Sequence, residues 1–251
     1  MTRWLISILA ILIVSIAEVH ALEFNSLPGS TWGRFSHDED RLVGTGSMGF
    51  LNQGVDWTTL PGGVVVNTFV EFRWRVRDQN NRFYNAYSHA LGLEFRKPPF
   101  RFGVNYLWER FPEITESSNK LQYFTTWFYS WDLNRKLLYL IKGLPGSTWG
   151  RFSHDEDRLV GTGSMGFLNQ GVDWTTLPGG VVVNTFVEFR WRVRDQNNRF
   201  YNAYSHALGL EFRKPPFRFG VNHLRERFPE LNETSSKVQY FMTWFYGWDL
   251  Q

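Results

Sequence analysis

The chain contains two nearly identical copies of one long segment. Leu27–Asn105 recurs without change as Leu144–Asn222, and the match continues with substitutions from Tyr106–Leu133 to His223–Leu250. This unit is far longer than the roughly 20–50 residues of a solenoid repeat. The duplication therefore concerns a domain or half-domain. We assign residues 22–133 to the first copy, 134–143 to a linker and 144–251 to the second copy.

The N-terminus has the pattern of a secretory signal peptide. Arg3 supplies a positive charge, Trp4–Ala17 is apolar, and Val19-His20-Ala21 offers small residues to a signal peptidase. As a helix the apolar stretch would rise about 21 Å, which is short of a bilayer core of roughly 30 Å. We therefore expect residues 1–21 to be removed after Ala21 rather than kept as an anchor.

Composition excludes several classes of protein. The chain has no cysteine, so neither disulfides nor a cysteine-based zinc site can stabilise it. The net charge of +3 is small and no basic cluster is present, so nucleic acid is not an expected partner. We expect no cofactor and no metal. Stability must come from a packed core, a closed sheet or a membrane.

Hydrophobic residues alternate with charged residues along Thr68–Arg77. Val70, Phe72, Trp74 and Val76 fall on one face of an extended chain, and the other face carries Glu71, Arg73, Arg75 and Arg77. Helical spacing would scatter these charges around a cylinder. The segment is therefore predicted to be a strand, followed by a turn at residues 78–81.

Similar alternation predicts further strands in the same copy. They are expected at Arg82–Arg96, Phe100–Trp108 and Lys120–Leu133, with two less regular strands at Trp32–Ser36 and at the glycine-rich Leu42–Trp57. The linker is apolar at residues 137–141, which favours a short strand or a packed crossover over a free tether. Five or six strands per copy give ten to twelve in the chain.

The strands match those of transmembrane β-barrels. Such strands span about 9–11 residues, with an apolar outer face, a polar inner face and aromatic girdles at the two membrane interfaces. The aromatic content of 18% and the ionised arginines on the second face fit this pattern. A soluble antiparallel domain explains the alternation equally well, but explains the aromatic content and the tandem copies less well. The fold prediction is an all-β, antiparallel transmembrane barrel of ten to twelve strands, built from both copies.

Two features of the sequence count against a barrel. The chain ends in Trp-Asp-Leu-Gln, whereas bacterial outer-membrane strands usually end in an aromatic residue. The second copy also has His223 and Arg225 where the first has Tyr106 and Trp108, on the face expected to meet lipid. An outward arginine costs about 2–4 kcal/mol at the midplane but only about 0–1 kcal/mol near an interface. The barrel therefore requires that this strand end lie at headgroup level.

Each copy resembles the C-terminal β domains of outer-membrane proteins from exopolysaccharide secretion and phage adsorption. The residues that carry the resemblance are Phe50–Trp57, Asn67–Arg77, Ala90–Glu94 and Trp127–Leu133. The resemblance covers most of each copy and includes no catalytic motif. It implies an outer-membrane location and the docking or passage of a polysaccharide.

Two sets of candidate functional residues follow. The charged face is expected to line the lumen and to meet solute, or to form internal salt bridges in a barrel too narrow to conduct. Its members are Glu71, Arg73, Arg75, Arg77, Arg101, Arg190, Arg192, Arg194 and Arg218. The tryptophans near strand ends are expected at the membrane interfaces. They are Trp74, Trp108, Trp127, Trp131, Trp244 and Trp248.

One polar cluster invites an enzymatic hypothesis. Ser36-His37-Asp38-Glu39-Asp40 and its copy at residues 153–157 contain the residue types of a hydrolase triad or a cation site. Neighbouring strand residues point to opposite faces, so the three side chains cannot converge without a loop. A solvated acidic turn is the preferred interpretation, and no catalytic residue is assigned. His89 and His206, beside serines in a strand, are an equally weak signal.

The sequence therefore predicts an exported outer-membrane barrel, not an enzyme, with a structural, export or surface-docking role. Its expected partners are the lipid bilayer and a polysaccharide or anionic solutes. The alternative is a soluble protein of the periplasm or the exterior, with two β domains that bind carbohydrate or a surface partner. The sequence leaves the oligomeric state open.

Overall fold

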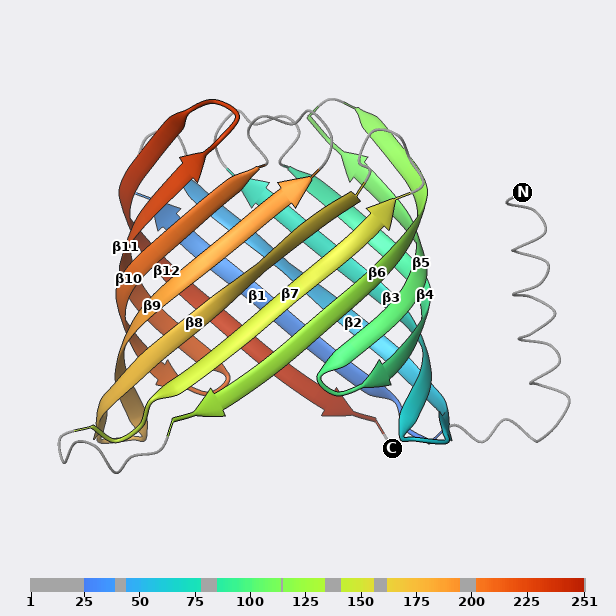
Figure 1. Cartoon of the computed structure of the whole chain (residues 1–251), viewed down its shortest axis with the longest axis horizontal. Helices are drawn as coiled ribbons and strands as arrows, with labels where there is room; N and C mark the ends of the chain where they lie inside the picture. The colour runs from blue at the N-terminus through green and yellow to red at the C-terminus, as the bar shows by residue number, and fades with distance from the viewer. Residues whose placement is uncertain are drawn as a thin grey trace, which may run out of the picture.

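A computed structural model describes residues 25–38, 44–77, 85–113, 115–133, 141–155, 162–194 and 202–250. These residues form twelve antiparallel strands that close into a single barrel (Figure 1). The strands of the first copy are β1 (Pro28–Asp38), β2 (Thr45–Leu60), β3 (Val64–Arg77), β4 (Ala86–Lys97), β5 (Phe100–Phe111) and β6 (Glu116–Asp132). Those of the second copy are β7 (Pro145–Asp155), β8 (Thr162–Leu177), β9 (Val181–Arg194), β10 (Ala203–Lys214), β11 (Phe217–Phe228) and β12 (Glu233–Asp249).

Each copy supplies one half of the barrel. Every strand pairs with its neighbours in sequence, and two junctions join the copies: β6 with β7, and β12 with β1. At the first junction Asp132 lies opposite Pro145, and the Leu133 amide donates to the Leu144 carbonyl at 3.1 Å. Neither copy closes alone, so the alternative of two separate β domains is wrong.

The two ends of the barrel differ in their connections. The lower end in Figure 1 carries the tight turns Pro61–Gly63 and Pro98–Pro99 and both ends of the described chain. At the upper end lie the ends of β1, β3 and β5 and the starts of β2, β4 and β6. Gly62 and Gly63 both have positive φ, which an L side chain would strain, so this turn requires glycine. The second copy repeats this arrangement.

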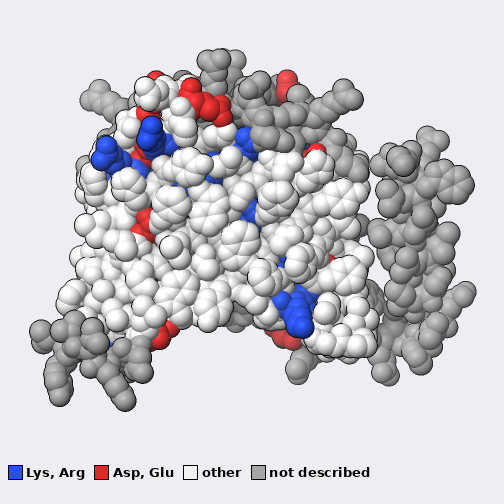
Figure 2. All heavy atoms as spheres, in the orientation of Figure 1, with Lys and Arg blue, Asp and Glu red and all other residues white. Residues whose placement is uncertain are grey.

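The strand alternation separates an apolar outside from a polar inside. Val70, Leu91 and Phe102 are each more than half exposed, whereas Asn67 and Asn105, on the opposite face, are almost completely buried. Figure 2 shows a broad band of largely uncharged atoms, with Lys, Arg, Asp and Glu gathered mainly toward the two ends. The barrel thus reverses the usual arrangement of a soluble domain, because its polar residues face inward.

Glycines allow tryptophan rings to pack flat against the outer wall. Trp74 on β3 and Trp244 on β12 lean toward each other over the intervening strands, and their rings stack at 6.3 Å. A Cβ atom on Gly33 would lie 2.0 Å from the Trp244 ring, and one on Gly49 would lie 2.5 Å from the Trp74 ring. Trp127 and Trp191 form the equivalent stack in the other half.

The predicted strands are confirmed, with corrected bounds. The irregular segments Trp32–Ser36 and Leu42–Trp57 are the regular strands β1 and β2, and β6 begins at Glu116 rather than at Lys120. The signal peptide, the turn at residues 78–81 and linker residues 134–140 lie outside the described residues. Linker residue Gly143 forms an isolated bridge with Asp173. Among the described residues, no helix is long and apolar enough to span a membrane.

Candidate solute-binding lumen

The charged residues of β3 point into the barrel and are paired there. Arg73 forms an ion pair with Glu71 on the same strand. The Arg75 guanidinium bonds Glu109 of β5 at 3.0 Å. Arg77 lies on the same inward face, where it packs beside Gly46. The sequence therefore placed these residues on the correct face, and the pairing favours internal salt bridges over a row of free cations.

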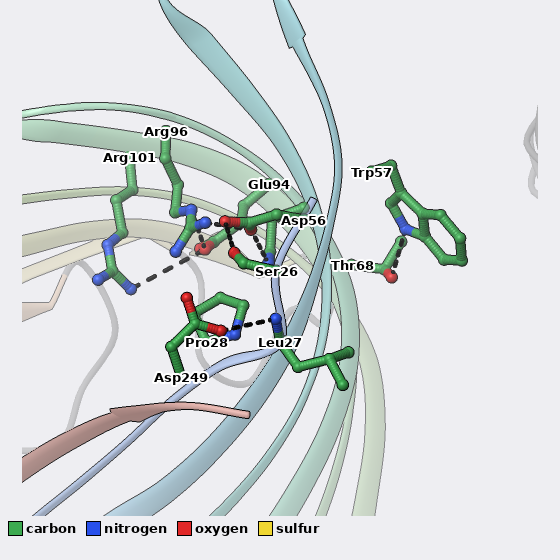
Figure 3. A network of polar contacts seen from close by, with 12 residues as sticks. Ser26, Leu27, Pro28, Asp56, Trp57, Thr68, Glu94, Arg96, Arg101 and Asp249 are labelled. Carbon is green, nitrogen blue, oxygen red and sulfur yellow. Dashed lines mark hydrogen bonds and ion pairs between the residues drawn. The ribbon is translucent and has the colours of Figure 1, made fainter. Parts of the chain in front are cut away.

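One side of the lower mouth of the lumen is built from β2 to β5. Arg96 pairs with Asp56 and, at 3.6 Å, with Glu94. Arg101 reaches the same Glu94 at 3.9 Å, and its side chain is 49% exposed. Figure 3 shows the two arginines side by side on the inner face of the wall, while Trp57 and Thr68 lie outside it. Arg96 is thus neutralised, and Arg101 is the cation that remains available to solute.

A cavity of about 440 Å³ opens at this mouth. Arg96, Arg101, Asn52 and Asn67 contribute polar groups to its lining, and Phe245 contributes an aromatic ring. The Phe245 side chain is 60% exposed although it lies on the inward face of β12. The mouth therefore offers a guanidinium, amides and an uncovered ring to one ligand.

An aromatic layer narrows the lumen above the lower mouth. Phe69 and Phe124 meet edge to face at 5.9 Å, and the Arg151 guanidinium lies 4.5 Å from the Phe124 ring centre. The Phe69 and Phe124 rings occupy the space above Gly92 and Gly103, where an added Cβ atom would lie 2.5 Å from a ring carbon. Small inward residues therefore make room for large ones in this narrow part of the lumen.

Buried ion pairs lie at both junctions between the copies. Lys120 of β6 bonds Asp155 of β7 at 3.0 Å, and Lys237 of β12 bonds Asp38 of β1 at 2.9 Å. All four side chains are at most 3% exposed. Gln122 donates to Asp155 at 2.6 Å and accepts a hydrogen bond from Arg151. The contacts between these polar groups join one copy to the other.

The second copy repeats these contacts. Arg190 pairs with Glu188 and Arg192 pairs with Glu226, while Arg213 pairs with Asp173 and Glu211. Arg194 occupies the position of Arg77 on β9, and Arg218 occupies the position of Arg101 on β11. All nine lumen candidates therefore face inward. Their contact with solute stays a prediction.

The predicted interface tryptophans have several environments. Trp131 and Trp248, near the lower end, stack on Tyr129 and Tyr246 and donate to Gln170 and Gln53 at 2.9 Å. Trp108 stacks on His89 near the upper end. The remaining candidates, Trp74, Trp127 and Trp244, belong to the stacks over the glycines described above, and Gly33 lies at the middle of β1. Their place at membrane interfaces stays a prediction.

The polar cluster of β1 does not assemble a triad. Ser36 and Asp38 share the inward face, whereas His37 points outward and bonds Thr45 at 3.0 Å. Glu39 and Asp40 lie outside the described residues. Ser88 is buried inside the barrel while His89 faces outward. Among the described residues, no group of three His, Asp or Glu side chains is arranged to hold a metal.

Sequence reasoning missed several inward residues. Lys120 and Gln122 were not singled out, and Asp155 was considered only within the polar cluster at residues 153–157, because their contacts depend on which strands meet at the junctions. Trp32 and Phe50 were also missed. Their rings stack at 6.4 Å on the inward face, where the girdle pattern gives no reason to expect large aromatics. Period-two alternation with Arg34 on the same strand could have indicated the direction of Trp32, whereas the direction of Phe50 follows from its pairing with Arg73 of β3.

Comparison with known proteins gives likeness of fold at low identity. LpxR from Salmonella typhimurium is 12% identical, with a TM-score of 0.43 over 86% of this chain and 100% of that one. An outer-membrane channel from Pseudomonas putida F1 is 10% identical, with a TM-score of 0.42 over 91% of this chain and 97% of that one. The β domain of the Bordetella autotransporter BrkA is 8% identical, with a TM-score of 0.39 over 88% of this chain and 98% of that one. No family model matches the chain, and no curated protein matches it.

The architecture itself determines the class of protein. The barrel is closed, its strands are long enough to cross a bilayer, its exterior is apolar and its interior is charged. A closed barrel satisfies every backbone hydrogen bond between strands, which a membrane requires. Outward apolar and inward polar residues distinguish the barrels of outer membranes from soluble sheets. The chain is an outer-membrane β-barrel.

Proposed function

We propose that this barrel docks anionic solutes, acidic saccharides foremost, at its lower mouth and admits them to a narrow lumen. The observation that carries the proposal is the cavity at that mouth, where Arg101 is half exposed beside Asn52 and Phe245. A guanidinium binds a carboxylate or sulfate through two parallel hydrogen bonds. Amides bind hydroxyl groups, and an exposed ring packs against the apolar face of a sugar.

The size of the cavity and its charge support a small bound segment rather than an open pore. Ligand sites commonly measure about 300–1,000 Å³, and the lower mouth falls within this range. Most inward arginines are already neutralised by carboxylates, so the lumen lacks the ring of free cations that a strongly anion-selective pore uses. Arg101 and its counterpart Arg218 differ from these because they are exposed near the lower end, and the contact of Arg101 with Glu94 is long, at 3.9 Å.

The orientation of the barrel follows the usual pattern. Outer-membrane barrels have short turns on the periplasmic side and longer loops outside. The short turns at residues 61–63 and 98–99 support a lower end in the periplasm and an upper end at the exterior. In that orientation the arginine mouth receives solute from the periplasm, which agrees with a role in export.

Single-barrel conductance in planar bilayers tests the proposal. A uronic-acid oligosaccharide added at the lower mouth should block the current. Arg101→Ala/Arg218→Ala should weaken the block about tenfold, since each removes a charge-assisted hydrogen bond. A neutral oligosaccharide of equal length is the control and should be unaffected by the substitutions. If the acidic sugar blocked the parent barrel and the Arg101→Ala/Arg218→Ala variant equally well, the docking role would be refuted.

A further inference from the structure

The polar differences between the two copies gather on one outward patch. Leu27–Asn105 is identical to its counterpart, so all structural asymmetry must come from the remaining segment. Within it, the five polar substitutions of the second copy lie at the upper end of β11 and β12 or in the turn between them, where they face outward or toward the upper rim; the other four differences are at Leu231, Val238, Met242 and Gly247. The five polar residues are His223, Arg225, Asn232, Thr234 and Ser236, which replace Tyr106, Trp108, Thr115, Ser117 and Asn119.

The patch forms a shallow hollow of about 280 Å³ on the outside of the barrel. Its lining consists of His206, Arg225, Arg227, Asn232 and Thr234. The strand register places His206 of β10 directly opposite Arg225 and places Thr234 of β12 opposite Arg227. Beside the hollow, the His223 imidazole and the Ser236 hydroxyl form a hydrogen bond of 2.9 Å. Three strands thus present donors to one place.

The cations of this patch lack acidic partners within the part of the chain that the structure describes. The inward Arg192 and Arg213 each form ion pairs, but neither Arg225 nor Arg227 lies within ion-pair distance of a described carboxylate. The nearby Glu226 points inward to Arg192 and Lys237. Figure 2 shows Lys and Arg atoms gathered at the upper left, over the upper ends of β10 to β12.

The first copy has an aromatic surface at the equivalent place. Trp108 stacks on His89 at 5.6 Å and meets Tyr106 edge to face at 4.6 Å. Such rings suit the boundary between acyl chains and headgroups. The second copy replaces these two rings with one histidine and one arginine, His223 and Arg225, without altering the strands. His206 and Arg227 are not new, because the first copy has the same residue types at His89 and Arg110. The same depth in the membrane therefore meets a different chemistry on the two halves of the barrel.

From this arrangement we infer that the patch binds the phosphate groups of a lipid in the outer leaflet. Arg225 lies three residues before the end of β11, about 10 Å along the strand, a depth that fits the headgroup region. Guanidinium groups recognise phosphate with two parallel hydrogen bonds, and imidazole and hydroxyl groups supply further donors. A phosphate also removes the cost of unpaired charge beside acyl chains. The inference rests on the outer-membrane location and the orientation, but not on saccharide docking.

Native mass spectrometry of the full barrel in detergent tests this inference. The probe is lipid A, whose headgroup carries phosphates, and dephosphorylated lipid A is the control. One lipid A should bind per barrel with an affinity about tenfold or more above that of the control, as expected for charge-assisted hydrogen bonds. His223→Tyr/Arg225→Trp gives the second half the first half's residues, so it should fold and lose this preference.

The reverse exchange provides a matched test. Tyr106→His/Trp108→Arg should add a second lipid A of similar affinity, and heat-modifiable gel mobility should show every variant to be folded. Undiminished binding by His223→Tyr/Arg225→Trp would overturn the inference, as would equal binding of dephosphorylated lipid A. No second lipid on the reverse variant would also count against it. Equally strong binding of inorganic phosphate would show that the site takes a free anion rather than a lipid.

Discussion

The ion pair between Lys120 and Asp155 should stabilise the junction where the first copy meets the second. The Nζ–Oδ2 distance is 3.0 Å and both side chains are 2% exposed. At an effective dielectric constant near 20, two unit charges at this distance attract by roughly 5 kcal/mol. Removing one partner of a buried pair typically costs about 3–5 kcal/mol, because the other charge remains buried.

We therefore expect Asp155→Leu to lower the free energy of unfolding by about 3 kcal/mol, the low end of that range. The low end applies because Lys120 keeps a second carboxylate, Glu109, at 3.5 Å. The double variant Lys120→Met/Asp155→Leu should lose only about 1 kcal/mol, since no buried charge is left and one hydrogen bond of Gln122 is lost. The two substitutions should thus be strongly non-additive.

Urea unfolding in lipid vesicles, followed by tryptophan fluorescence in both directions, measures these differences. The other junction is an internal control. There Lys237 keeps only a weaker contact with Glu226, at 4.0 Å, so Asp38→Leu should be at least as destabilising as Asp155→Leu. A double variant as unstable as the sum of the single variants would refute the assignment. So would an Asp155→Leu barrel as stable as the parent.

Two further perturbations test the packing and the duplication. Gly33→Val should destabilise the barrel by about 1–3 kcal/mol, because its Cβ would lie 2.0 Å from the Trp244 ring; Gly247→Ser, which restores the residue of the other copy, should change the urea midpoint little. The two junctions are alike, so the chain should tolerate circular permutation. A permuted chain that starts at Ile141, with residue 250 joined to residue 25, should still show heat-modifiable gel mobility. A permuted chain that never folds would contradict the equivalence of the junctions.

Period-two alternation predicted the two faces of the barrel but not the contacts between strands. Val70 and Arg73 could be assigned to opposite faces, because successive side chains of any strand alternate. Lys120 and Asp155 could not be paired, because they come from different copies and meet only through the register of β6 with β7. The pattern of the glycine-rich β2 was irregular for a related reason. Gly49 leaves space for the Trp74 ring that covers it, and that ring comes from another strand.

The positions of the junctions suggest how a barrel of this kind arises. The β6–β7 and β12–β1 pairings have corresponding registers, with Gln122 opposite Asp155 and Gln239 opposite Asp38. Two separate copies of the unit would meet through the same two pairings, so the present chain has the contacts of a symmetric dimer within one covalent barrel. Covalent linkage frees the halves from identity, since a substitution in one no longer occurs in both. The change from Trp108 to Arg225 requires this freedom, because in a true dimer it would place an arginine on both sides of the barrel.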